Sequence, residues 1–237
     1  MARRADAEAV RHERAVVACE RCPRLVRHCR RVARERRRAY AAEAYWGRPV
    51  PTSLPGGGAR AVRLWVVGLA PAAHGANRTG RMFTGDRSGD FLYAALHRAG
   101  FASAPVSLAR HDGTHLLECA ISAAVRCAPP GNRPTAGEVA RCRPFLDAEW
   151  DLFPGARAVL ALGRLAFDQS LGLFRRHGLL SARQPHFAHG LCLRDASGGP
   201  ALLASYHVSQ QNTFTRRLTP AMLDSVLHQV QRIVRDP

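Results

Sequence analysis

The sequence predicts an α/β protein, a three-layer α/β/α sandwich around a central, mostly parallel four-stranded sheet. Two observations predict this class. Short apolar runs, each the length of a buried strand, alternate along the chain with longer segments of helical periodicity. In addition, 237 residues with 46% hydrophobic content are enough to bury one sizeable core. Alternating strands and helices imply a parallel sheet that helices cover on both faces.

The N-terminal part differs in composition from the rest. The first forty residues favour helix, because Ala, Glu and Arg dominate a sparse apolar stripe, and residues 19–23 interrupt this pattern. Residues 46–58 contain three prolines and three consecutive glycines, which cannot continue a helix and predict an extended linker. We therefore expect residues 1–58 to be an N-terminal helical segment with a linker, and residues 59–237 to be the α/β core, in one structural domain overall.

The core consists of four strand and helix signals in alternation. The expected strands, each short and apolar, are residues 62–67, 116–125, 158–162 and 202–206. The expected helices, each with apolar residues at helical spacing, are residues 91–100, 138–150, 165–174 and 222–234. A Gly, Ser and Pro stretch at residues 195–200 predicts a hairpin-like surface loop. Because ligands of such sheets bind beyond the carboxyl ends of the strands, we expect the site near Gly68 and His207.

The charge balance indicates a polyanionic partner. The chain has 35 basic and 18 acidic residues, a formal net charge of +17 and a pI near 11.2, and every basic residue is arginine. Nucleic acid is the partner that this balance favours. A GC-rich bacterial genome would explain arginine in place of lysine but not the shortage of acids, so a basic but otherwise ordinary enzyme remains the alternative.

The chain has no signal for a membrane or a secretory route. It contains no run of about 18 apolar residues, and no apolar signal-peptide segment follows its N-terminus. We expect a soluble cytoplasmic protein without a membrane partner. In a reducing cytosol, seven cysteines predict metal binding more readily than disulfides.

Four cysteines have spacings that fit a metal site. Cys19 and Cys22 form a CxxC pair, and Cys127 and Cys142 make a plausible second pair. Four thiolates suit zinc and an iron–sulfur cluster equally, and the second pair could also be small buried residues. The remaining cysteines have no partner at ligand spacing and are expected to be structural: Cys29, Cys119 and Cys192.

The loop at residues 68–86 is the first candidate pocket segment. Its four glycines let the backbone turn sharply and approach a ligand, and it contains neither a Walker A motif nor a dinucleotide fingerprint. Asp86 could orient a water molecule or cap the helix that begins near Ser88. Phe83 is a hydrophobic residue in a polar loop, so it is either a stacking platform or a core anchor.

The loop at residues 207–217 is the second candidate pocket segment. It follows an expected strand and carries many hydrogen-bonding side chains without an acid, which suits nucleic-acid backbone and base edges. His207 could donate a hydrogen bond to a leaving base, although a lone histidine is more often structural.

Four sequence blocks resemble the family 5, or type b, uracil-DNA glycosylases. The blocks are Cys-x2-Cys-Pro-Arg-Leu at residues 19–25, the glycine-rich loop at 68–86, Ala-Val-Arg-Cys-Ala-Pro-Pro-Gly-Asn-Arg-Pro-Thr at 124–135, and Ser-Tyr-His-Val-Ser-x-Gln-Asn-Thr at 205–213. The resemblance runs from about Cys19 to the C-terminus. It implies a uracil-DNA glycosylase-like fold and a [4Fe–4S] cluster on Cys19, Cys22, Cys127 and Cys142, with zinc as the alternative.

The resemblance also implies roles for individual residues. In the wider superfamily an acid or Asn that positions water occupies the place of Leu69-Ala70, and family 5 lacks it as this sequence does. The implied catalytic residues are Asp86, Asn132 and His207. The residues expected to bind the substrate base are Gly68, Ala70, Ala73, His74, Gly75, Asn77 and Phe83. The residues expected to bind DNA are Ser209, Gln210, Gln211, Asn212 and Arg216.

The expected function is DNA repair. We expect a monofunctional, monomeric hydrolase that excises uracil from double-stranded DNA, with hypoxanthine and other deaminated or modified bases as further substrates and single-stranded DNA as a further substrate form. Base excision requires the target nucleotide to leave the stack. The alternative from another class is a non-catalytic cysteine-metal DNA-binding protein, which leaves both pocket loops without a use.

Overall fold

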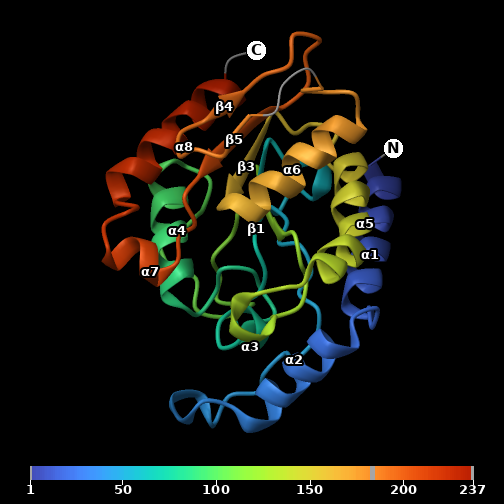
Figure 1. Cartoon of the computed structure of the whole chain (residues 1–237), viewed down its shortest axis with the longest axis vertical. Helices are drawn as coiled ribbons and strands as arrows, with labels where there is room; N and C mark the ends of the chain where they lie inside the picture. The colour runs from blue at the N-terminus through green and yellow to red at the C-terminus, as the bar shows by residue number, and fades with distance from the viewer. Residues whose placement is uncertain (1, 182–184, 236–237) are drawn as a thin grey trace.

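The computed structural model, which describes residues 2–181 and 185–235, is built on a five-stranded sheet with the strand order β2-β1-β3-β5-β4 (Figure 1). Four strands are parallel: β1 (Leu64–Gly68), β2 (Cys119–Ala123), β3 (Ala158–Leu162) and β5 (Ala201–Ser205). The fifth strand, β4 (Cys192–Leu193), pairs antiparallel with β5. The predicted fold class is confirmed, but the strand number of four is wrong, because a two-residue strand leaves no pattern in the sequence. The loop that joins β4 to β5 contains the predicted hairpin-like segment.

Helices cover both faces of the sheet. Side chains of β1 alternate between the faces: Leu64 and Val66 belong to one buried cluster, and Trp65 and Val67 to another. The first cluster includes residues of α4 (Arg87–Arg98) and α8 (Pro220–Arg235). The second includes residues of α5 (Ala136–Leu152) and α6 (Arg164–Arg176). The two clusters are the two interfaces of the predicted three-layer sandwich.

The N-terminal segment forms two helices with the predicted interruption between them. α1 (Ala2–Val17) packs beside α5, and α2 (Pro23–Glu35) lies at the lower end of the molecule in Figure 1. A third buried cluster joins this segment to the core and contains most of the cysteines, together with Val16, Leu25 and Phe145. The N-terminal helices therefore meet the core through their own small hydrophobic contact.

Several element boundaries differ from the expected ones for local reasons. α4 begins four residues early because Asp86 caps it, and β2 is shorter because Leu116 forms only an isolated bridge with Ala102. Short helical turns lie in segments without helical periodicity: η1 (Arg38–Tyr40), η2 (Ala59–Ala61), α3 (Ala76–Thr79), η3 (Pro130–Asn132) and α7 (Gln210–Phe214). Among the described residues, no helix combines the length and the apolar character that crossing a membrane requires.

Candidate active site and cysteine cavity

The two candidate pocket loops lie at the same edge of the sheet. Because β1, β2, β3 and β5 are parallel, their carboxyl ends meet there, and residue 68 lies opposite residue 123 while residue 162 lies opposite residue 205. The pairing continues past the strands, with Ala124 N donating to Gly68 O at 2.9 Å and Gly163 N donating to Ser205 O at 2.8 Å. Both loops therefore start from fixed positions, as the strand-end rule predicts.

Phe83 lies between the two loops. Its ring packs so closely on Gly68 that a Cβ there would lie 2.8 Å from the ring carbons Cε2 and Cζ. The ring centroid is 6.2 Å from that of His207, with 41° between the ring planes. The backbone of Phe83 has φ = +51°, a left-handed conformation that is strained for a bulky residue by about 1–3 kcal/mol. Such strain gathers at functional sites, which favours a role for this ring beyond core packing.

His207 lines an open cavity of about 660 Å³ at this edge. Leu69 and Pro134 line the same cavity, as do Gly163 and Gln169. Burial lowers the pKa of His207 to about 4, so its imidazole is neutral at physiological pH. Gly163 allows this position of the histidine, since it has φ = +90° and a Cβ there would lie 3.0 Å from His207 Cβ. The size of the cavity fits a small-molecule or base-sized ligand.

Asp86 has two differently placed carboxylate oxygens. Oδ1 accepts a hydrogen bond of 2.9 Å from Gly89 N and so caps α4, which confirms one of its two expected roles. Oδ2 faces Gly75, where a Cβ would lie only 1.8 Å away. Burial raises the pKa of Asp86. The catalytic role of Asp86 remains a prediction. Because the cap uses only Oδ1, Oδ2 is left for that role.

Asn132 lies on the exposed turn η3, where Gly131 and Asn132 both have positive φ values, 61° and 57°. This turn belongs to the loop whose Pro134 lines the cavity of His207. Arg24 donates to the backbone oxygen of Arg133 at 3.3 Å, so α2 contacts the same loop. Asn132 therefore lies on an exposed turn, two residues before the cavity-lining Pro134, rather than at a strand end.

The remaining residues expected to bind the base mainly connect the first loop to the N-terminal segment. His74 Nδ1 lies 3.1 Å from the hydroxyl of Tyr45. Asn77 is fully buried, and its Nδ2 donates to the backbone oxygens of Cys29 and Ala73. Ala70 packs against the cysteine-containing cluster. That these side chains contact the base stays a prediction. The contacts just described show that they hold the first loop against the N-terminal segment.

The second loop folds into the short helix α7. Ser209 caps it by accepting from Asn212 N at 3.4 Å, and Asn212 Nδ2 donates to His207 O at 2.8 Å. These two residues therefore order the backbone next to His207, while three others expected to bind DNA are exposed: Gln210, Gln211 and Arg216. No sequence motif points to Phe214, whose side chain is 64% exposed beside the guanidinium of Arg87.

The four predicted cluster cysteines line one narrow cavity: Cys19, Cys22, Cys127 and Cys142. Two nitrogens donate hydrogen bonds to these sulfurs. Arg126 N lies 3.3 Å from Cys142 Sγ, and Arg141 Nε lies 3.5 Å from Cys22 Sγ. Burial raises the pKa of Cys142 to about 11. Among the residues that the structure describes, however, no three His, Cys, Asp or Glu side chains are grouped tightly enough to hold a metal ion.

Cys29 is expected to be structural, and the structure places it in a neighbouring cavity that Cys19 and Cys127 also line. It lies on α2, seven residues after Cys22, and is buried. A thiol hydrogen bond joins it to Cys127, and its Sγ also contacts Ala128 O at 3.7 Å. Cys22 is the N-cap residue of α2 and Cys29 lies about two turns further along the helix, a spacing that could have indicated this neighbour.

A buried ion pair joins the segment that contains Cys127 to α5. Arg126, which precedes Cys127, pairs with Glu149 of α5 at 2.6 Å, and both side chains are almost completely buried. Glu149 also contacts His12 of α1 at 3.2 Å and the hydroxyl of Thr52. Three separate parts of the chain therefore converge on one carboxylate.

Comparisons with known proteins agree with this geometry. A family model described as the uracil DNA glycosylase superfamily matches residues 55–231. A protein of Mycobacterium leprae named type-5 uracil-DNA glycosylase is 52% identical over 219 residues, which cover 92% of this chain and 92% of the relative. Proteins with the same name from Thermus thermophilus and Pyrobaculum aerophilum are each 47% identical, over 218 and 212 residues; the matches cover 92% and 90% of this chain and 94% and 87% of the relatives.

Proposed function

This chain belongs to the uracil DNA glycosylase superfamily, and we propose that it excises uracil from DNA by hydrolysing the N-glycosidic bond, the first step of base excision repair. The observation that carries this function is the cavity at the strand ends, where a neutral His207 lies beside the ring of Phe83. The relatives that cover most of the chain are named for the same activity.

The uracil nucleotide must rotate out of the duplex to reach this cavity, at a cost of a few kcal/mol for unstacking. The arginine-rich surface supplies part of the binding energy through phosphate contacts. Gln210 and Gln211, exposed on α7, contact the groove that the base leaves. Phe83 then stacks on the extruded ring, since its backbone holds it between Gly68 and His207.

His207 stabilises the leaving base. When the bond between C1′ and the base nitrogen breaks, the electron pair goes to uracil, and the negative charge spreads from that nitrogen onto the carbonyl oxygens. A neutral imidazole donates an N–H hydrogen bond to that charge without itself ionising, and the low pKa of His207 keeps it neutral at physiological pH. A donor positioned in this way contributes roughly 10²–10³ to the rate.

Asp86 and Asn132 act on the sugar side. The carboxylate of Asp86 stabilises the positive charge that develops at C1′ and orients a water molecule, which adds its oxygen to C1′ and loses one proton; net transfer of a proton to the uracil anion gives neutral uracil. Asn132, exposed on η3, contributes hydrogen bonds to the same water or sugar. The products are free uracil and an abasic site.

The enzyme is monofunctional on this proposal. A glycosylase that also cleaves the strand commonly uses an amine to form a Schiff base with C1′, and lysine is the usual side chain for such chemistry. This chain contains no lysine. Water is therefore the nucleophile, and the phosphodiester backbone stays intact.

The substrate range extends beyond uracil on this proposal. Leu69 lines the cavity. By the family resemblance, it occupies, together with Ala70, the place where members of the wider superfamily carry an acid or Asn. An apolar residue in place of the acid or Asn suits a less selective pocket, which favours acceptance of hypoxanthine and other deaminated bases. A non-catalytic DNA-binding protein, the alternative from the sequence, would have no use for this cavity.

A single-turnover assay tests the function. Duplexes with uracil, hypoxanthine or thymine opposite guanine are incubated with excess enzyme, and abasic sites are read as strand breaks after alkali. Uracil excision with intact strands before alkali is expected. Strand breaks without alkali would contradict monofunctional chemistry, and no excision from the uracil duplex would overturn the proposed function.

We further propose that Cys19, Cys22, Cys127 and Cys142 hold a [4Fe–4S] cluster. The four side chains line one cavity but are not grouped around a single ion position. The resemblance of the four sequence blocks to family 5 favours a cluster, in which each thiolate binds a different iron, over zinc, whose four ligands converge on one ion. The cluster would supply a covalent link between the start of α2 and the α5 segment. It has no part in the excision steps above.

The form of the protein and of its substrate completes the proposal. We propose that the N-terminal segment at residues 1–58 and the core at 59–237 act as one domain, since α1 packs on α5 and Val50 lies within the main core cluster. The enzyme acts as a monomer on double-stranded DNA, and on single-stranded DNA as a further form. Its place is the cytoplasm, where a bacterial chromosome lies.

A further inference from the structure

The exposed face of α2 carries a row of arginines. Leu25, Val26, Cys29 and Val32 are the buried side of this helix. On the opposite side, residues at intervals of three and four lie above one another, and they are Arg24, Arg27, Arg31 and Arg34. With Arg30 they line a groove of about 620 Å³ that also includes Pro130. We call this surface, formed by Arg24, Arg27, Arg30, Arg31 and Arg34, the α2 arginine face.

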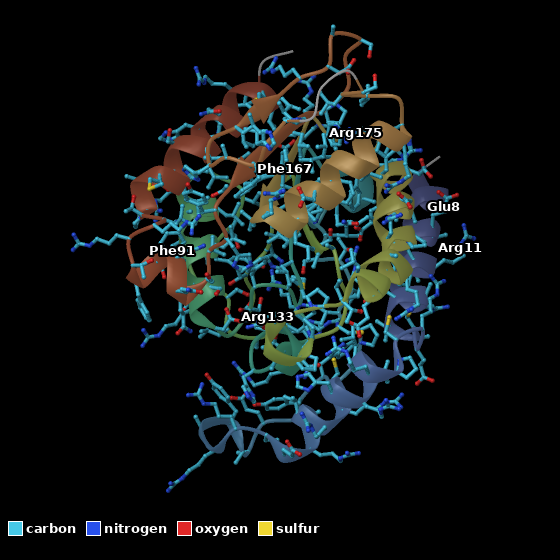
Figure 2. The ribbon with its side chains drawn as sticks, viewed as in Figure 1. Glu8, Arg11, Phe91, Arg133, Phe167 and Arg175 are labelled. Atoms are coloured by element: carbon cyan, nitrogen blue, oxygen red, sulfur yellow. The ribbon has the colours of Figure 1, made fainter. Side chains whose placement is uncertain are left out.

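The α2 arginine face adjoins the loop that borders the active-site cavity. Pro130 at one end of that loop lines the arginine groove, and Pro134 at the other end lines the cavity of His207. The labelled Arg133 of this loop lies between α2 and α6 in Figure 2. A DNA strand whose extruded nucleotide lies in the cavity can therefore continue across this loop and place its phosphates on α2.

An ion pair fixes the helix in this position. Arg24 donates two hydrogen bonds, of 2.8 and 2.7 Å, to the carboxylate of Glu138, and a third of 3.3 Å to Arg133 O. Glu138 is nearly buried and also completes a capping box with Thr135 at the start of α5. Arg24 is thus occupied in joining α2 to the loop and the helix beyond it.

Two arginines of the face remain uncompensated. Arg30 pairs with Glu20, and Arg31 lies 4.0 Å from Glu35. Arg27 and Arg34 are exposed and make no ion pair within the described part of the chain. They are seven residues apart, on the same side of the helix. Free guanidinium groups in a groove are suited to phosphate oxygens, which they bind in a fork geometry.

We propose that the α2 arginine face binds the phosphate backbone of the DNA duplex that flanks the extruded nucleotide, with Arg27 and Arg34 as the phosphate ligands. This inference rests on the proposed function. The row from Arg24 to Arg34 is about 15 Å long at 1.5 Å per residue. It therefore spans about four base-pair steps at 3.4 Å each, on one side of the lesion.

The experiment compares the salt dependence of DNA binding. The probe is a duplex with a tetrahydrofuran abasic-site analogue, and fluorescence anisotropy gives the dissociation constant between 50 and 200 mM salt. The Arg27→Gln/Arg34→Gln variant removes both positive charges and keeps polar side chains with a similar helix propensity. Loss of two phosphate contacts is expected to reduce the slope of log K against log salt by about 1.8.

The matched control is Arg232→Gln/Arg235→Gln. These exposed arginines lie near the C-terminal end of α8, at the opposite end of the molecule from α2 in Figure 1. The control removes the same net charge, so its salt slope is expected to match that of the wild type. An equal loss in both variants would show a general charge effect and overturn the proposal, as would an unchanged slope in the α2 variant.

A second arm locates the contact. Duplexes that end one base pair beyond the lesion on one side only are compared with full-length duplexes. The difference between the wild type and the α2 variant is expected to disappear for truncation on one side and to persist for truncation on the other. A difference that survives both truncations would contradict the placement. If wild-type protein failed to excise uracil, the proposed function would fall independently of these binding results.

Discussion

The carboxylate of Asp86 lies against the backbone of Gly75, so closely that a Cβ at position 75 would be 1.8 Å from Oδ2. The same carboxylate caps α4 through its other oxygen. The position of Asp86 therefore depends on a residue eleven positions away having no side chain.

Gly75→Ala is expected to displace Asp86. The new methyl group would force the carboxylate away from its position, and a displacement of about 1 Å at a catalytic group can cost about 10²-fold in rate. We expect the single-turnover rate to fall at least tenfold, with a loss of about 1 kcal/mol from the weakened cap. Gly56→Ala is the control, because nothing lies within 4 Å of a Cβ there. Similar rates for the two variants would contradict this account.

Asp86→Asn separates capping from chemistry. Asn is as good an N-cap as Asp, so the unfolding free energy should change by less than about 0.5 kcal/mol. The negative charge is lost, so the single-turnover rate is expected to fall by two orders of magnitude or more while binding to the abasic-analogue duplex stays at the wild-type level. Wild-type rates in this variant would remove the carboxylate from the mechanism.

The pH profile should reflect a neutral His207. The pKa of His207 is lowered to about 4, so the imidazole does not take up a proton between pH 8 and pH 5, and no inflection near 6.5 is expected in the single-turnover rate. Burial raises the pKa of Asp86, so the rate should fall on the acid side as that carboxylate is protonated, at higher pH than for an exposed Asp. A loss of rate centred near 6.5 would show that His207 titrates normally.

The folding stability has a matching pH dependence. The unfolded chain binds a proton at His207 near pH 6.5, and the folded protein binds it only near pH 4. The contribution of the neutral histidine is thus complete above about 6.5 and is lost as the pH falls towards 4. In His207→Gln this part of the pH dependence of urea unfolding is expected to disappear, and an unchanged dependence would count against the lowered pKa.

Replacement of one of the four proposed cluster cysteines should remove the bound iron, whereas replacement of Cys29, which lies beside Cys127, should not. Cys142→Ser is expected to give protein without the broad visible absorbance and the bound iron and sulfide of an iron–sulfur cluster. Cys29→Ser and Cys192→Ser are the controls, one buried beside Cys127 and one exposed. Purified wild-type protein that holds one zinc and no iron would contradict the cluster. Iron loss in Cys29→Ser would make that residue a ligand.

Arg126→Ala should be strongly destabilising. It leaves the buried carboxylate of Glu149 with only His12 and Thr52 as partners, and loss of one member of a buried ion pair typically costs about 3–5 kcal/mol. Arg98→Ala breaks a half-exposed pair with Asp224 instead and should cost less than about 1 kcal/mol. The double variant Arg126→Met/Glu149→Leu is expected to recover much of the loss, and thermal unfolding measures all three. Equal melting temperatures for the two single variants would contradict the buried pair.

Much of the site was predictable from where the strands end. Gly68 and His207 were placed at the sheet edge because each follows an apolar run, and the structure confirms that position. The same rule applies to Gly163, directly after β3, but a glycine has no polar side chain that could indicate a site in the sequence. The two-residue strand β4 was missed because two residues carry no periodicity.

Other features depend on contacts between distant segments. The bond between Arg24 and Glu138 joins residues 114 positions apart, and neither residue is distinctive in the sequence. The net charge indicated a nucleic acid, but only the helix α2 and its buried side show which arginines share a face. The left-handed backbone of Phe83 is set by tertiary packing, so no local propensity could have predicted it.

The packing of Phe83 also limits how this pocket can change in evolution or in the laboratory. Its ring requires Gly68, and its backbone oxygen requires Gly89, where a Cβ would lie 2.1 Å away. A side chain at Gly68 is therefore tolerated only after Phe83 has moved or become smaller, and one at Gly89 only after the backbone of Phe83 has moved. Single-site libraries at these three positions would return mostly inactive variants, and a new base specificity would have to be sought by randomising Gly68, Phe83 and Gly89 together.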